Sequence, residues 1–251
     1  MNYYKDIFCA EEKIEDLANL TGEKWTFSYE GAKENGILLN YLAHTYEKLA
    51  HEDKLFVDEA EGKMIFNTGL FDEFYESIYA YLELNELENK QKWYTVGFKT
   101  AYDLARCGVD NSLLPERANY FEDPAQLIFD ANCPINIQFS HIFNDPDNIK
   151  RLPEKVKDAT NRTTLFRGAL DLMVKSVTAN YKLAVPQYYK GKIQLLLPVC
   201  LIDPNVADVA LVVTKSKNGK YYQGHTCLTL DMAYNNARLI AKPDSNWLNV
   251  K

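Results

Sequence analysis

The stretches KIQLLLPVCLI (192–202) and DVALVVTK (208–215) decide the fold class of this chain. The segment IQLLLPVCL is apolar on both faces, as a central strand of a sheet should be. LAVPQYY (183–189) precedes it with strand composition, and Asn218-Gly219 is a turn signal that leads into a fourth strand. The C-terminal third therefore predicts a sheet of four strands.

Helices are predicted by apolar residues at helical spacing in residues 11–20, 36–50, 160–182 and 228–241. Thr160 or Asn161 would cap the third of these helices, and Thr229 would cap the fourth. We expect the last three helices to pack on the sheet.

The remaining strands are predicted from shorter signals. Two apolar runs near 54–58 and 63–67 flank the polar EAEG turn and indicate a hairpin. Residues 76–84 and 93–100 also favour strands, and 135–143 is an apolar strand within the proline-punctuated region 103–160. The predicted fold is α+β, with a mixed, mainly antiparallel sheet packed by helices. It is expected as a single domain, or as two lobes that divide in residues 103–160. An acidic helical segment, 1–52, would precede the α+β domain, 53–251.

Composition places the chain among ordinary globular proteins, with 47% hydrophobic, 13% aromatic and 25% charged residues. No apolar run is long enough to span a membrane, and the acidic start of the chain lacks the apolar segment of a secretion signal. Five scattered cysteines without a CxxC pair favour a reducing compartment, so we expect a cytoplasmic protein.

Charge is unevenly distributed around a net value of −7. Residues 1–90 carry a net charge of −12, whereas residues 91–251 carry +5 and contain all six arginines. The stretch 150–192 holds ten basic residues against three acidic ones. This asymmetry indicates an anionic partner. The alternative is a solvated basic surface that has no ligand.

Several motifs resemble one known family. They are GHTCLTLDMAYNNARLIAKPDSNWL (224–248), KIQLLLPVCL (192–201), ADVALVV (207–213), FNTGL (66–70), and FSHI with KRLP (139–142 and 150–153). Together they resemble the OST-HTH-associated (LOTUS-associated) domain of unknown function over about residues 55–250. In larger proteins that domain sits beside modules thought to contact RNA. The resemblance therefore implies a role linked to RNA or nucleotides.

The main candidate ligand-binding residues lie in the predicted strand, turn and helix at 222–238. A helix N-terminus that follows glycine and hydroxyl side chains suits a phosphate group. Asn235 and Arg238 are three residues apart, so one helical face can present an amide and a guanidinium to a nucleotide. In the alternative interpretation, Arg238 pairs with a buried carboxylate. The candidates here are Tyr222, His225, Thr226, Tyr234, Asn235 and Arg238.

Further candidates lie outside this segment. His141 and Arg151 flank the loop FNDPDN (143–148) and could bind or protonate a phosphate. Arg162 and Arg167 belong to the basic stretch, and Asn67 follows a strand in Asn67-Thr68-Gly69, which is either a ligand loop or a simple turn. Pairs of tyrosines stand beside lysines at 188–192 and 220–222, which suits stacking on unpaired bases. Tyrosines at strand edges are the alternative.

These observations predict a non-catalytic binder of RNA or of a smaller nucleotide ligand, which uses a basic, aromatic-lined face. One alternative is an enzyme that acts on a nucleotide or RNA phosphate, with His141 or His225 as the acid or base. A second alternative is a module whose acidic N-terminal part binds a protein. The sequence has no HExxH, GxGxxG or GxxxxGK[ST] motif, so we expect neither a metal nor a cofactor. The ligand and the oligomeric state stay open.

Overall fold

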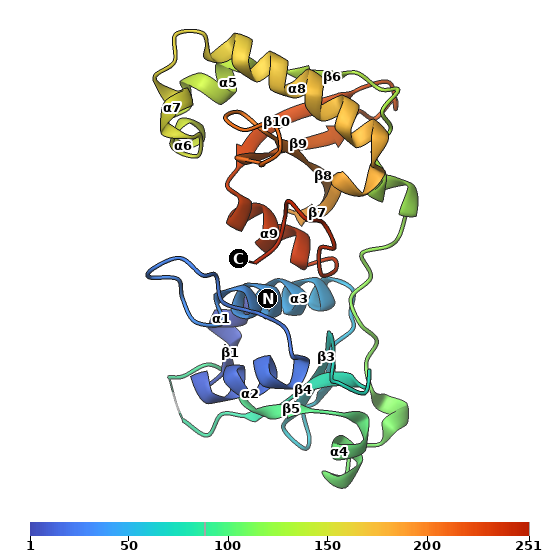
Figure 1. The fold of residues 1–251 in the computed structure, drawn as a ribbon. Coiled ribbons are helices and arrows are strands. Elements are labelled where there is room, and N and C mark those ends of the chain that lie inside the picture. Colours follow the sequence, from blue (N-terminus) through green and yellow to red (C-terminus); the bar gives the residue numbers. More distant parts are fainter. Residues whose placement is uncertain (88, 251) are drawn as a thin grey trace. The chain divides into compact units, whose positions relative to one another are not determined.

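The computed structural model describes residues 1–87 and 89–250, which form two compact units. Unit 1 comprises residues 1–119 and unit 2 comprises residues 120–250 (Figure 1). Each unit contains one five-stranded mixed sheet with helices packed against it. The predicted α+β class, with mainly antiparallel mixed sheets, is confirmed. The compact units divide at residue 119, within the region 103–160 where two lobes were expected to divide, and not at residue 52, where the acidic helical segment was expected to end.

The sheet of unit 1 has the strand order β1-β5-β4-β3-β2. β1 is parallel to β5, and the other neighbours are antiparallel, including the predicted hairpin of β2 and β3. The elements are α1 (Tyr3–Asp6), β1 (Ile7–Phe8), α2 (Glu11–Thr21), α3 (Gly36–His51), β2 (Phe56–Asp58), β3 (Lys63–Phe71), β4 (Ser77–Leu84), β5 (Trp93–Lys99), α4 (Ala101–Arg106) and the 3-10 turn η1 (Asn111–Leu113).

The helices α2 and α3 pack against strands of this sheet. α3 buries Leu38, Leu42 and Leu49, which lie on one helical face. A separate cluster joins Leu104 of α4 to Ile65 and Tyr81 of the sheet. The helices of the acidic segment 1–52 therefore belong to unit 1, and this is why no division falls at residue 52.

Asn67 lies within β3, and not after a strand as the sequence predicted. The pairing of β3 with β4 shifts register between Asn67 and Leu70, which marks a bulge. Asn67 Oδ1 accepts a hydrogen bond from the backbone N–H of Gly69 at 2.9 Å, and its Nδ2 donates to the carbonyl of Pro115 at 3.3 Å. Asn67 is only 7% exposed. Its amide therefore stabilises the bulge in unit 1.

We expect Gly69→Ala to lower the free energy of unfolding by about 2 kcal/mol, because two costs add. Gly69 has φ +73°, and a Cβ there would lie 2.8 Å from Tyr41 Oη, which donates to the carbonyl of Thr68. Gly22→Ala is the matched control, since Gly22 has φ +59° and no atom within 4 Å of the added Cβ. Gly22→Ala should lower the free energy of unfolding by about 1 kcal/mol. Equal losses in urea unfolding would show that the contact with Tyr41 contributes nothing.

The sheet of unit 2 has the strand order β6-β10-β9-β8-β7, with β6 parallel to β10 and the other pairs antiparallel. The four strands that the C-terminal third predicted are confirmed. The elements are the 3-10 turn η2 (Pro124–Leu127), β6 (Ile135–Ile137), α5 (Phe139–Asn144), α6 (Pro146–Lys150), α7 (Glu154–Lys157), α8 (Arg162–Ala179), the 3-10 turn η3 (Tyr181–Leu183), β7 (Val185–Tyr189), β8 (Lys192–Val199), β9 (Val209–Lys215), β10 (Tyr222–Leu228) and α9 (Leu230–Arg238).

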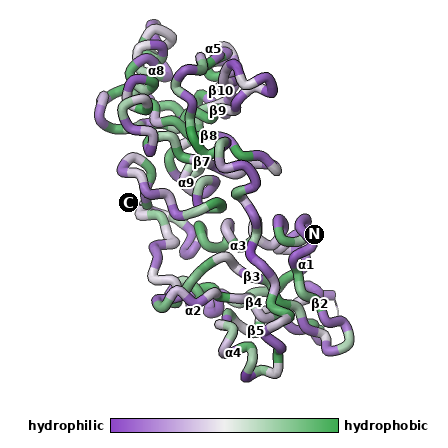
Figure 2. Tube along the Cα trace, turned by 90° about the vertical axis from the view of Figure 1, so that its right-hand side faces the viewer, coloured by the Kyte–Doolittle hydropathy of each residue, from purple (hydrophilic) through white to green (hydrophobic). Residues whose placement is uncertain are grey.

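The two long helices of unit 2 lie on opposite sides of its sheet (Figure 1). On one face, Phe166 and Met173 of α8 pack on alternate residues of β8 and β9, such as Leu197 and Leu211. On the other face lies α9, capped by Thr229 as predicted, with the Thr229 side chain accepting from the N–H of Met232. Figure 2 shows the hydrophobic residues along β8 and β9. Both faces are covered, which explains why β8 is apolar on both sides from residue 195 to residue 199.

The predicted strand 135–143 is wrong over most of its length. Only 135–137 form a strand, β6, and 139–144 form the helix α5. Phe139, Ile142 and Phe143 recur at helical spacing, and Phe143 packs edge-on against Phe166 with ring centroids 5.7 Å apart. The helix lets these three side chains face α8 together, which a strand with alternating sides does not allow. Among the residues that the structure describes, no helix has the length and apolar character of a transmembrane span.

Candidate nucleic-acid interface

The turns of two hairpins lie next to each other at one end of the unit 2 sheet. In the first, Tyr189 pairs with Lys192 across Lys190 and Gly191, whose φ values of +47° and +78° are typical of a two-residue type I′ turn. In the second, β9 and β10 are joined by residues 216–221, with Gly219 at φ +71°. Because β8 and β9 are antiparallel neighbours, both turns are at the same sheet end.

We call these two turns and their flanking residues the hairpin end. It gathers the two tyrosine- and lysine-rich segments that the sequence analysis considered separately. Lys215 forms a salt bridge with Asp130 at 3.0 Å, whereas the other four lysines form none within the described part of the chain. The Lys190 ammonium lies over the Tyr189 ring, 5.2 Å from its centroid. The hairpin end contains Tyr188, Tyr189, Tyr221 and Tyr222, with Lys190, Lys192, Lys215, Lys217 and Lys220.

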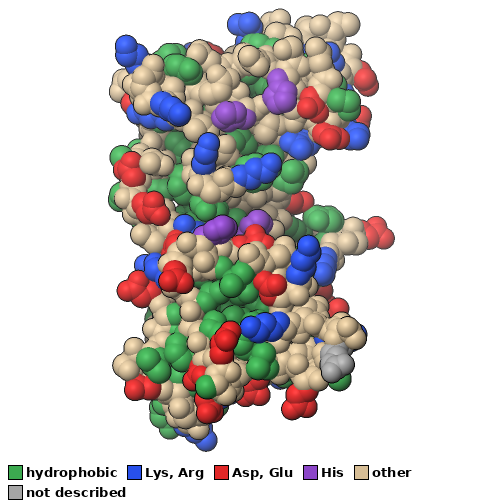
Figure 3. All heavy atoms as spheres, turned by 180° about the vertical axis from the view of Figure 1, so that it is seen from behind, with side chains coloured by type: hydrophobic (Ala, Val, Ile, Leu, Met, Phe, Trp, Pro, Cys, Tyr) green, Lys and Arg blue, Asp and Glu red, His purple; other side chains and the backbone are tan. Residues whose placement is uncertain are grey.

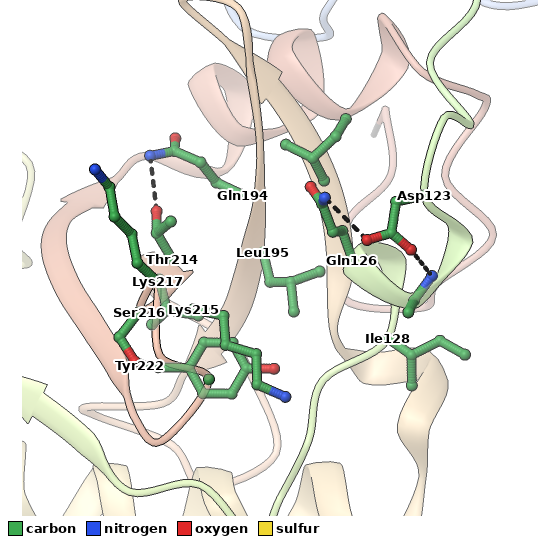
Figure 4. A pocket seen from close by; sticks show the side chains of 14 residues that line it. Asp123, Gln126, Ile128, Gln194, Leu195, Thr214, Lys215, Ser216, Lys217 and Tyr222 are labelled. Carbon is green, nitrogen blue, oxygen red and sulfur yellow. Dashed lines mark hydrogen bonds between the residues drawn. The ribbon is translucent and has the colours of Figure 1, made fainter.

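A cavity of about 420 Å³ adjoins the hairpin end. Figure 4 shows side chains from η2 on one side, those from the β9–β10 hairpin on the other, and Leu195 between them. The lining residues are Asp123, Ala125, Gln126, Ile128, Ile193, Gln194, Leu195, Val213, Thr214, Lys215, Ser216, Lys217, Gly219 and Tyr222.

Tyr222, a predicted ligand residue, is part of this lining but is itself only 2% exposed. Its ring stacks on Phe129 with centroids 4.7 Å apart, and its hydroxyl oxygen accepts from the backbone N–H of Asp130 at 3.0 Å. Burial raises the pKa of Tyr222 above its ordinary value. Tyr222 therefore forms a fixed wall of the cavity.

A row of hydrogen-bonded side chains crosses unit 2 from α9 to β10. Asn236 Nδ2 donates to Gln187 Oε1 at 3.0 Å, and Gln187 Nε2 donates to Gln194 Oε1 at 2.8 Å. Gln194 Nε2 then donates to Thr214 Oγ1 at 3.2 Å, and Thr214 Oγ1 lies 3.1 Å from His225 Nε2. Gln187 is 1% exposed. A buried amide needs such partners, because an unpaired one costs about 1–3 kcal/mol.

Gln187, Gln194 and Thr214 were not among the residues predicted from the sequence. One signal could have found them. Gln187 and Gln194 interrupt otherwise apolar strands and face each other across a two-residue turn. Polar residues at paired positions of two apolar strands indicate a hydrogen bond on a shared sheet face.

His225 lies at a bulge of β10, where the pairing with β9 shifts between Gly224 and Thr226. The bulge leaves the side chain exposed beside Thr214. Partial burial lowers the pKa of His225, and the nearby His141 and Lys192 lower it further. His225 is therefore mainly neutral at pH 7. Figure 3 shows two histidines close together on unit 2, among lysine and arginine side chains.

Arg151 and Thr226 come together in a hydrogen-bonded cluster that joins α6 to β10. Arg151 Nη1 donates to Asn148 Oδ1, Thr226 Oγ1 and the carbonyl of Cys227, at 3.1, 3.2 and 3.1 Å. Thr226 Oγ1 also donates to Asn148 Oδ1, and Asn148 Nδ2 donates to the carbonyl of His141 at 3.1 Å. One end of the Arg151 guanidinium is thus used within the protein, where it connects segments about 75 residues apart.

Arg162 and Arg167 lie over aromatic rings of α5. The Arg162 guanidinium carbon is 5.2 Å from the Phe143 centroid, and that of Arg167 is 4.7 Å from the Phe139 centroid. Arg162 Nη1 also donates to the carbonyl of Lys157 at 3.1 Å. These contacts hold the first turns of α8 against α5, while Arg167 stays exposed.

The candidates on α9 are largely buried. Tyr234 and Arg238 are each 5% exposed, and Asn235 is half-buried. The sequence predicted that one open helix face presents Asn235 and Arg238 together. In the structure, burial of Arg238 prevents this. Asn235 Oδ1 has no hydrogen-bond partner within the residues that the structure describes.

Among the described residues, no group of three or more His, Cys, Asp or Glu side chains could hold a metal ion. All five cysteines are free.

Comparison with known proteins identifies the family. Residues 17–247 match the family described as a domain of unknown function (DUF3825). The OST-HTH-associated family that the motifs indicated is therefore a wrong assignment, since the match over residues 17–247 is to a different family. Searches of curated proteins and of solved structures found no match. Because the family match spans almost all of the chain, the protein belongs to the DUF3825 family.

Proposed function

We propose that unit 2 binds single-stranded RNA without catalysing a reaction, and that the hairpin end is the contact surface. One observation carries this proposal. The strand register brings two lysine- and tyrosine-rich turns, about 30 residues apart in the chain, to one sheet end. The proposal includes a cytoplasmic location, because a reducing compartment suits five free thiols.

The chemistry of the hairpin end fits an unpaired nucleic acid strand. Four lysines without salt bridges to described residues can neutralise phosphates, and they do so at little cost because they are already exposed. Tyr189 beside them is 48% exposed and provides a ring face, on which an unpaired base can stack without regard to sequence. Unit 2 also carries 15 Lys or Arg against 12 Asp or Glu, whereas unit 1 carries 12 against 23. The net charge is therefore positive in unit 2 and negative in unit 1.

The test is the salt dependence of RNA affinity, measured by fluorescence anisotropy with a labelled single-stranded 12-mer. Four phosphate contacts predict a slope of log K against log salt near −3, since each contact on a single strand contributes about −0.7. Affinity should then fall about 50-fold between 50 and 200 mM salt. A duplex of the same length should bind more weakly. A flat salt dependence, or equal affinity for the duplex, would reject the proposal.

The same samples distinguish binding from catalysis. Mass spectrometry of the RNA after incubation, with and without Mg²⁺, should show unchanged oligomer. A product that forms with the intact protein but not with His141→Ala or His225→Ala would favour the enzyme alternative. A general acid or base usually contributes about 10²–10⁴ in rate, so the variant that lacks it would form product measurably more slowly.

A further inference from the structure

We propose that the cavity beside the hairpin end holds one base of the bound strand and prefers guanine, an inference that rests on the proposed RNA binding. Three features of the cavity carry it: an apolar floor, a wall of hydrogen-bond acceptors and a lysine without a salt bridge in the described chain. In a nucleotide, the base ring would match the floor, the donors on the base edge would match the acceptors, and the phosphate would match the lysine.

The floor suits a planar ring. Ile193, Leu195 and Val213 come from β8 and β9, and the fixed ring of Tyr222 stands beside them. The volume of about 420 Å³ lies within the range of about 300–1,000 Å³ that small-molecule sites occupy. Leu195, Val213 and Tyr222 are at most 3% exposed, so a base would lay one face on the half-buried Ile193 above them, with its edge near the polar wall.

The wall on η2 presents acceptors. Asp123 Oδ1 accepts from the N–H of Ala125 at 3.1 Å, and Asp123 Oδ2 accepts from Gln126 Nε2 at 3.1 Å. The carboxylate keeps further lone pairs, and Gln126 keeps its carbonyl oxygen, so the wall requires a ligand that donates. Guanine presents two adjacent donors, N1–H and the 2-amino group, that match a carboxylate. Uracil presents one N–H between two carbonyl oxygens, which a carboxylate repels.

The opposite side presents positive charge. The Lys215 ammonium is held by Asp130, whereas Lys217 forms no salt bridge in the described part of the chain. Figure 4 shows Lys217 on the hairpin side and Asp123 on the η2 side of the pocket. A nucleotide has the same polarity, with base donors at one end and a phosphate at the other. Lys217 would therefore bind the phosphate of the base that Asp123 recognises.

The experiment is calorimetric titration with 5′-GMP, AMP, CMP and UMP. GMP should bind at least tenfold more tightly than UMP. Asp123→Asn should abolish this preference, because Asn retains an oxygen for the N–H of Ala125 but replaces the charged acceptor. Lys217→Ala should weaken GMP binding about tenfold. Lys220→Ala is the matched control, since Lys220 lies in the same turn but does not line the cavity. Its effect should be under twofold. Unchanged melting temperatures would verify folding of each variant.

Two results would overturn the inference: equal affinity for the four nucleotides, or equal effects of Lys217→Ala and Lys220→Ala. If these occur while single-stranded RNA still binds with steep salt dependence, the guanine pocket fails and the RNA function stands. If RNA does not bind at all, the proposed function itself fails.

Discussion

Replacement of Lys190, Lys192 and Lys220 by glutamate is expected to weaken single-stranded RNA binding by about 10³-fold at 100 mM salt. The three positions lie in or directly beside the two adjacent turns, so the substitution removes three attractive charges and places three repulsive ones against the same phosphates. None of the three lysines lines the cavity, and none forms a salt bridge within the described residues. The fold should therefore tolerate the change. Fluorescence anisotropy measures the affinity, and circular dichroism verifies the fold.

The matched control reverses three exposed lysines elsewhere in unit 2: Lys155, Lys182 and Lys242. It changes the net charge by the same amount but leaves the hairpin end intact. We expect this control to lose less than tenfold in RNA affinity, because only the long-range attraction between unit 2 and the RNA becomes weaker. If the control lost as much affinity as the hairpin variant, binding would depend on the overall charge of unit 2, and the hairpin end would have no special role.

Arg151→Met is expected to lower the free energy of unfolding by about 3 kcal/mol, because hydrogen bonds from a charged donor are worth about 1.5–3 kcal/mol. The variant removes donors to Asn148 Oδ1, Thr226 Oγ1 and the carbonyl of Cys227. Thr226 can still donate to Asn148, but the carbonyl of Cys227 loses a charged partner beside a buried side chain. Urea unfolding followed by circular dichroism measures the loss.

Arg167→Met is the matched control, since it makes the same substitution in the same unit at an exposed arginine that lies over Phe139. We expect a loss under 1 kcal/mol, as is typical of an exposed cation over a ring. Equal small losses would show that Arg151 contributes little to stability. If Arg151→Met then lowered RNA affinity at unchanged stability, Arg151 would act as the ligand residue that the sequence indicated.

Much of the secondary structure could be predicted from the sequence because its signals are local. The apolar run of 195–199 indicates burial of both strand faces, and the spacing of apolar residues in 162–179 indicates one buried helix face. The local signal failed at 135–143, where apolar residues fit either a strand or a helix. Packing of Phe139 and Phe143 against α8 selected the helix there. It failed also at Asn67, where a bulge continues β3 past an apparent turn.

The residue types of the candidate site could likewise be read from the sequence, since tyrosines and lysines stand beside each other in both turns. Their arrangement could not. The register of β7 to β10 places the two turns together and aligns Gln187, Gln194 and Thr214 into one row that ends at His225. Arg151 is used within the protein because β10 passes beside α6. These relations join residues from about 7 to 76 positions apart, and they depend on strand pairing and packing, which no local pattern specifies.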